Sequence, residues 1–138
     1  MDNANTGTAE KSPLRRYIGV KIVEAWPEDK VCDGDNVSSA GYAVKYSDGF
    51  QSWCPKQQFE EANRPCDAMT FGHALEAMKQ GQKVKLPSWA DDVFISVQTP
   101  DENSKMTAPY LYVTSRFGCV PWKETMIELF SDDWQIVE

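Results

Sequence analysis

The chain has 138 residues, of which 41% are hydrophobic and 12% aromatic, and its net charge at pH 7 is −7. This apolar content suits a folded core rather than a disordered chain, and the acidic balance argues against binding along a long nucleic acid. No apolar run reaches the roughly 18 residues that a membrane helix needs, and the polar N-terminus lacks the apolar stretch of a secretory signal. We expect a cytosolic protein without a membrane segment.

The four cysteines and the single histidine argue against a metal or cofactor site. Cys32, Cys54, Cys66 and Cys119 form no C-x-x-C pair, and free thiols are the default without an export signal. His73 is the only histidine, which excludes a multi-histidine metal site. We expect no metal and no cofactor.

The first half of the chain reads as a tail followed by a small sheet and a helix. Residues 1–14 are small and polar, which predicts a disordered tail. Alternation of apolar residues predicts a strand over 17–25 that ends at Trp26-Pro27, and a polar loop follows over 28–40. Two further strands are predicted over 41–46 and 50–53, joined by a turn at Ser47-Asp48-Gly49, and a short helix is predicted over 56–62.

The second half begins with an amphipathic helix. Thr70 is a good N-cap, and an apolar face and a terminating Gly81 follow it; the face comprises Phe71, Ala74, Leu75 and Met78. A polar loop is predicted over 99–108 and a second helix over 123–130. Strands are predicted over 82–86, 93–98, 110–115, 119–120 and 134–137.

These elements predict an α+β fold of small antiparallel sheets, each packed with one short helix, in two linked modules. The modules are residues 15–66, a β-hairpin and helix, and residues 67–138.

Catalytic chemistry has little support in the sequence. His73 is not placed near a thiol, and the carboxylate pairs Asp91-Asp92 and Asp132-Asp133 read as solvated loop caps. No glycine-rich phosphate loop is present. We therefore expect a binding protein and no enzyme.

Two tryptophans at strand ends are the candidate binding residues. Trp89 and Trp122 each follow a strand and lie near a proline, where an indole can form one wall of a pocket. Stacking a base on such a ring contributes roughly 1–3 kcal/mol and needs no positive charge. Thr125 and Glu128 follow on one side of the next helix and could contact a ribose and a base edge; alternatively, Thr125 is an N-cap and Glu128 a solvated helix charge.

Trp53 and Trp134 fit packing roles, because each belongs to a strand of the predicted sheets.

Three segments of the second half resemble a bacteriophage family, the Thoeris anti-defence proteins of the second type. They are MTFGHALEAMKQGQKVKLPSW, PYLYVTSRFGCVPW and the closing T-x-x-E-L-x-x-x-D-W-x-I-V, which together span residues 69–138. The first half is similar to a module that is often joined to this domain in phage proteins.

The resemblance implies that residues 67–138 form a sponge-like anti-Thoeris domain. Such proteins bind cyclic ADP-ribose-type immune signals, notably glycocyclic ADP-ribose, and hold them in the host cytoplasm without cleaving them. Some members also hold cyclic dinucleotides at a separate site. The family forms homotetramers with pockets between subunits.

Matched by motif position, the resemblance implies ligand-binding roles for five residues: Trp89 and Trp122 as stacking rings, Thr125 and Glu128 as polar contacts, and Phe71 as a residue that shapes the pocket. The chain departs from the family at Leu86, where many members have arginine, and at Glu124, where many have proline. Candidates to replace the arginine are Lys83, Lys85 and Arg116.

Two other functions remain open at the level of sequence. The net charge of −7 also fits an acidic phage module that inhibits a host protein by binding it. A hydrolase of the same signals is the third alternative, and its product would be a cleaved nucleotide.

Overall fold

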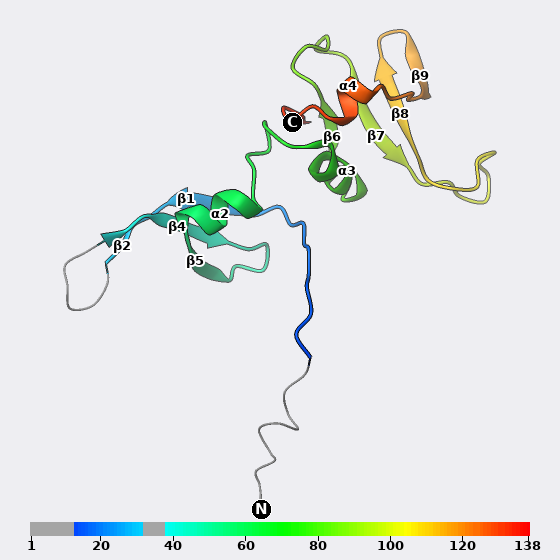
Figure 1. Cartoon of the computed structure of the whole chain (residues 1–138). Helices are drawn as coiled ribbons and strands as arrows, with labels where there is room; N and C mark the ends of the chain where they lie inside the picture. Colours follow the sequence, from blue (N-terminus) through cyan, green and yellow to red (C-terminus); the bar gives the residue numbers. More distant parts are fainter. Residues whose placement is uncertain (1–12, 32–37) are drawn as a thin grey trace, which may run out of the picture.

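The structure, a computed structural model, describes residues 13–31 and 38–138. They form two groups of antiparallel strands with short helices, joined by a linker that follows α2 (Lys56–Ala62) (Figure 1). The α+β class expected from the sequence is confirmed. The tail predicted for residues 1–14 lies outside the described residues, apart from residues 13 and 14.

The N-terminal sheet has three antiparallel strands in the order β1-β4-β5, namely β1 (Glu24–Pro27), β4 (Gly41–Lys45) and β5 (Gln51–Pro55). Gly49, at φ 90°, makes the predicted turn between β4 and β5. Helix α2 packs on the sheet by stacking Phe59 on Tyr42, with ring centroids 4.2 Å apart. The Tyr42 hydroxyl also donates a hydrogen bond of 2.7 Å to Glu60 Oε2. One ring pair and one polar pair thus anchor this helix.

The strand predicted over residues 17–25 is wrong for most of its length. β1 begins at Glu24 and includes Trp26 and Pro27, which the sequence predicts to end it. Glu24 pairs with Lys45, the last residue of β4, so no described strand lies beside the residues before Glu24. Residues 13–23, which we call the arm, therefore continue as an extended segment (Figure 1, dark blue).

The loop predicted over residues 28–40 contains a short ladder that the sequence does not reveal. β2 (Lys30–Val31) pairs antiparallel with β3 (Ser38–Ser39). The pairing of Pro27 with Tyr42 in β1 and β4 has the same register as that of Lys30 with Ser39. The ladder is thus an extension of the β1–β4 pair, and that continuity explains strand structure in so polar a segment.

The C-terminal sheet has five antiparallel strands in the order β10-β6-β7-β8-β9. They agree with the predicted strands to within two residues at each end; their bounds are β6 (Lys83–Lys85), β7 (Phe94–Gln98), β8 (Tyr110–Ser115), β9 (Gly118–Pro121) and β10 (Gln135–Val137). Trp134 precedes β10 and forms an isolated bridge with Met69. This bridge brings the first and last parts of the C-terminal domain together.

The predicted amphipathic helix is α3 (Phe71–Lys79). Thr70 Oγ1 accepts a hydrogen bond from the His73 amide at 3.3 Å, which confirms the predicted cap. Gly81 has a φ of 97°, as the left-handed turn after the helix requires. The second helix is shorter than predicted: α4 (Met126–Leu129) begins after its cap at Thr125, so residues 123–125 lie outside it.

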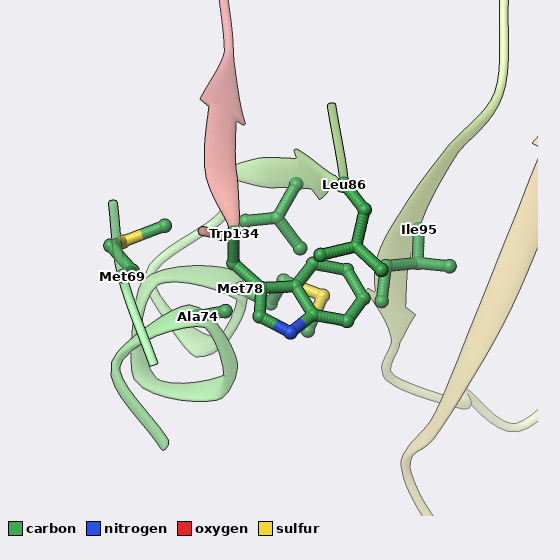
Figure 2. Packing of buried hydrophobic residues seen from close by; sticks show 7 residues of the cluster. Met69, Ala74, Met78, Leu86, Ile95 and Trp134 are labelled. Atoms are coloured by element: carbon green, nitrogen blue, oxygen red, sulfur yellow. The ribbon is translucent and has the colours of Figure 1, made fainter. Parts of the chain in front are cut away.

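The core of the C-terminal domain lies where α3 faces the sheet. Figure 2 shows Trp134 surrounded by side chains from α3, β6 and β7. The fully or almost fully buried members of this core are Met69, Ala74, Met78, Val84, Leu86, Ile95 and Trp134. Among the described residues, no helix has the length and apolar character to cross a membrane.

Candidate functional site

Four aromatic residues from separate parts of the C-terminal domain pack together, and we call Phe71, Trp89, Trp122 and Trp134 the aromatic cluster. Trp134 is fully buried, and its centroid lies 5.3 Å from that of Trp89 and 6.0 Å from that of Trp122, both with ring planes close to perpendicular. Phe71 stacks on Trp122 at 5.7 Å. Such pairs stabilise one another beyond their burial, so the rings hold fixed positions.

Trp134 forms the base of the aromatic cluster, as its predicted packing role requires. Its indole Nε1–H donates to the Glu128 carbonyl oxygen at 3.0 Å, which connects the buried Trp134 ring to α4. Trp53 is half-buried in the N-terminal module and donates to the Glu28 carbonyl oxygen at 2.7 Å. It therefore has no part in the cluster.

Trp89 and Trp122 are half-buried and lie against the core at the cluster's outer side. The Trp89 amide donates to the Leu86 carbonyl at 3.0 Å, and the Trp122 amide donates to the Leu111 carbonyl at 2.9 Å. Both tryptophans thus have a fixed backbone and a ring that is partly accessible to solvent. The structure brings these two predicted site residues together with Phe71.

Lys85 holds the loop that carries Trp89, a role that sequence reasoning missed. Its side chain is 13% exposed, and its ammonium group lies 3.2 Å from the carbonyl oxygens of both Trp89 and Ala90. Asp91 Oδ1 lies 3.9 Å away. The signal available in the sequence was a lysine at the end of a strand, shortly before the proline that begins the Trp89 loop.

Thr125 and Glu128 lie next to the cluster and bond to each other. The Glu128 amide donates to Thr125 Oγ1 at 3.2 Å, and the Thr125 amide donates to Glu128 Oε1 at 2.9 Å, which is a capping box. The N-cap alternative for Thr125 therefore describes its geometry. The hydroxyl is exposed and Glu128 is half-buried, and a carboxylate retains acceptor capacity on its second oxygen.

The structure places both departures from the family pattern and the three candidate replacement cations. Leu86 is 6% exposed and belongs to the core. Of the three candidate replacement cations, Lys85 holds the Trp89 loop, Arg116 lies 3.8 Å from Asp92 Oδ2, and Lys83 lies over the Phe94 ring at 4.9 Å. Glu124 is exposed before the cap of α4.

An exposed apolar surface adjoins this region. Met126, Ile127 and Phe130, which we call the α4 apolar face, are 68%, 82% and 84% exposed. An apolar surface of this kind on a folded domain is typical of a site that contacts another molecule.

A separate cavity lies outside the aromatic cluster. It has a volume of about 590 Å³ and lies between the arm, α2 and α3, where its lining includes Ile22, Phe59, Met69 and His73. None of the aromatic cluster lines it.

Local contacts shift the pKa values of some described ionisable side chains. Burial, with Asp67 and Glu138 nearby, raises the pKa of the Cys66 thiol, which disfavours the reactive thiolate. Hydrogen bonding from the Arg116 amide lowers the pKa of Asp92. Across residues 13–31 and 38–138, no three His, Cys, Asp or Glu side chains are grouped so that they could hold a metal ion.

The family model described as Tad2-like, Thoeris anti-defense 2-like domain, matches residues 69–137. That span includes the whole aromatic cluster and α4. No curated protein matches the chain.

Proposed function

The chain belongs to the Tad2-like family of Thoeris anti-defense 2-like domains, and on that premise we propose that it binds and withholds a cyclic ADP-ribose-type immune signal. Glycocyclic ADP-ribose is the proposed ligand. The ligand is held intact in the host cytoplasm, so the protein acts as a sponge and not as an enzyme.

The arrangement of the aromatic cluster is the observation that supports this proposal most. Trp89 and Trp122 lie on a fully buried Trp134, so little side-chain freedom remains to be lost when a base stacks on them. Thr125 and Glu128 offer acceptors beside the rings for ribose hydroxyls. Phe71 stacks on Trp122 and fixes its orientation.

The second wall of the pocket comes from another copy of the chain in this proposal. The two tryptophans are half-buried at an open surface, and the α4 apolar face next to them is exposed. A homotetramer would cover that face and enclose the ligand. The exposed Lys123 directly follows Trp122 in the sequence. In this proposal it is the cation that contacts a phosphate of the ligand.

Two further elements belong to the proposal. Residues 15–66 form an extra phage module joined to the family domain. Cyclic dinucleotides are a second ligand class, bound apart from the aromatic cluster.

A capture experiment tests the proposal. The purified full chain is incubated with cyclic ADP-ribose isomers and cyclic dinucleotides, washed and denatured, and the released molecules are identified by mass spectrometry. We expect intact glycocyclic ADP-ribose from the wild type and at least tenfold less from Trp89→Ala/Trp122→Ala.

Phe117→Ala is the matched control, because Phe117 is an aromatic residue of the same domain that is 88% exposed and outside the cluster. It should retain ligand as the wild type does. Equal retention by a folded double variant would refute the assignment of the site, and a cleaved product would show a hydrolase instead.

The acidic protein-interaction module remains the second candidate, favoured by the α4 apolar face and the net charge of −7. This second candidate would be supported if the wild type released no nucleotide on denaturation and bound a host protein in a salt-sensitive way.

A further inference from the structure

The arm has the sequence of a strand but no strand beside it. Its apolar side chains are exposed: Leu14, Tyr17 and Ile18 are 93%, 87% and 98% exposed, and Val20 and Ile22 are 41% and 38% exposed. β-branched residues alternate at positions 18, 20 and 22, which is the pattern of a strand with one covered face.

The arm also continues an open sheet edge. β1 is an outer strand of the β1-β4-β5 sheet, so its far side presents unpaired backbone groups. An exposed apolar edge of this kind is a template for pairing with another strand. The arm and β1 together offer one edge that runs from residue 16 to Pro27.

We propose that this edge pairs antiparallel with the same edge of a second copy of the chain, about a two-fold axis at Ile22. The interface lies outside residues 69–137 and does not depend on the proposed nucleotide binding. The hydrogen-bond direction of β1 restricts the axis to a single residue, and the charges at the two ends of the edge then select Ile22.

The first observation is which residues point their backbone groups outward. The Glu28 amide donates to the Gly41 carbonyl at 2.8 Å, directly opposite in register, so even-numbered residues bond inward to β4. Odd-numbered residues then present their amides and carbonyls to the outer edge. Antiparallel pairing must join odd residues with odd, which places the two-fold axis on a single residue.

The second observation is charge. Arg15 and Arg16 precede the apolar part of the arm, and Glu28 and Asp29 follow β1. An axis at Ile22 places Arg16 opposite the partner copy's Glu28 and Arg15 opposite its Asp29. Moving the axis by one residue to position 23 places Arg16 opposite Lys30, and moving it to position 21 places Arg16 opposite Trp26. Only the Ile22 axis pairs all four charges favourably.

The same register aligns the apolar residues. Ile18 lies opposite Trp26 of the other copy and Ile22 lies opposite itself, while Val20 lies opposite Glu24, so the face is apolar at its centre and at the Ile18–Trp26 pairs and carries one carboxylate between them on each side. Trp26 is 40% exposed and available for this contact.

Disulfide trapping tests the register directly. In a full-length background with the four native cysteines replaced by serine, Ile22→Cys places two thiols across the axis in a pair that is not hydrogen-bonded, where Cβ atoms lie roughly 4.5–5.5 Å apart. Val20→Cys is the matched control on the same face. Its two copies lie four residues apart, about 13 Å. We expect Ile22→Cys to form a covalent dimer at least tenfold faster than Val20→Cys.

Charge reversal then tests the pairing of the ends. Arg16→Glu should slow cross-linking of Ile22→Cys at least threefold, and adding Glu28→Arg should restore the rate. No cross-link at Ile22, equal rates at positions 20 and 22, or no rescue by the double reversal would each overturn the proposal. Nucleotide retention by the same variants should remain unchanged, which separates this interface from the binding site.

Discussion

Thr125 and Glu128 satisfy each other's backbone amides, with hydrogen bonds of 3.2 and 2.9 Å, and the Glu128 carbonyl accepts a hydrogen bond from the indole of the buried Trp134. The same two side chains thus stabilise the start of α4 and are proposed to contact the ligand. Since α4 has only four residues, its cap is a large part of what holds it.

Replacing Thr125 by alanine should lower the free energy of unfolding by about 1 kcal/mol, because an N-cap hydroxyl is lost. Chemical denaturation measures this change. Thr125→Ser keeps the hydroxyl and should restore both stability and ligand retention. A folded Thr125→Ala variant with unchanged stability would mean that the capping box contributes nothing.

Replacing Lys85 by methionine should loosen the Trp89 loop, because the ammonium group that reaches the Trp89 and Ala90 carbonyls is removed while the apolar stem remains. We expect ligand retention to fall at least threefold in the capture assay. Lys83→Met is the control, since Lys83 lies over Phe94 and not over this loop. Equal effects at the two positions would assign the loss to charge alone.

Replacing Ile127 by glutamate should reduce the oligomer, because it puts a charge on the α4 apolar face, where the wild-type side chain is 82% exposed. Sedimentation measures the change in mass. A folded variant with wild-type mass would exclude this face as the interface of the proposed tetramer.

Replacing Gly41 by alanine should destabilise the N-terminal module by about 1–3 kcal/mol, since the new methyl group would overlap the Trp53 ring and the Cys54 carbonyl oxygen. Gly19→Ala is the matched control, because nothing lies within 4 Å of its added carbon. Thermal unfolding of both variants decides the prediction.

The Asp92 carboxylate should make stability depend on pH at the acidic end. The Arg116 amide donates to its Oδ2 at 2.9 Å and lowers its folded-state pKa below the ordinary value. The contribution of Asp92 to the free energy of unfolding is therefore complete above the ordinary pKa of an aspartate, and it is lost as the pH falls through the lower folded-state pKa. The difference in unfolding free energy between wild type and Asp92→Asn should shrink on acidification, and a difference independent of pH would contradict this.

The sequence predicted the elements whose information is local. The cap at Thr70, the turn at Gly81 and strand β8 follow from residue types within a few positions. The strand predicted over residues 17–25 rests on a genuine alternation of apolar residues. A strand needs a neighbouring strand, however, and β4 ends at Lys45, opposite Glu24. The sequence of residues 17–23 carries no information about where β4 ends.

The candidate site was predictable only as a set of residues. The positions of Trp89 and Trp122 at strand ends are visible in the sequence. Their packing on Trp134, and the reach of Lys85 to the Trp89 carbonyl, depend on how separate strands meet. The periodicity of apolar residues along the chain carries no information about how separate strands pack together.

The bridge between Met69 and Trp134 has a consequence for how the family domain can be joined to other parts. The two residues exchange backbone hydrogen bonds of 2.9 and 3.0 Å, and the Ile136 amide donates to the Cys66 carbonyl at 2.9 Å. The entry and exit of the domain therefore lie side by side at one margin of its sheet. A module attached at either end emerges from the same place, so fusion or exchange of neighbouring modules leaves the five-stranded sheet intact.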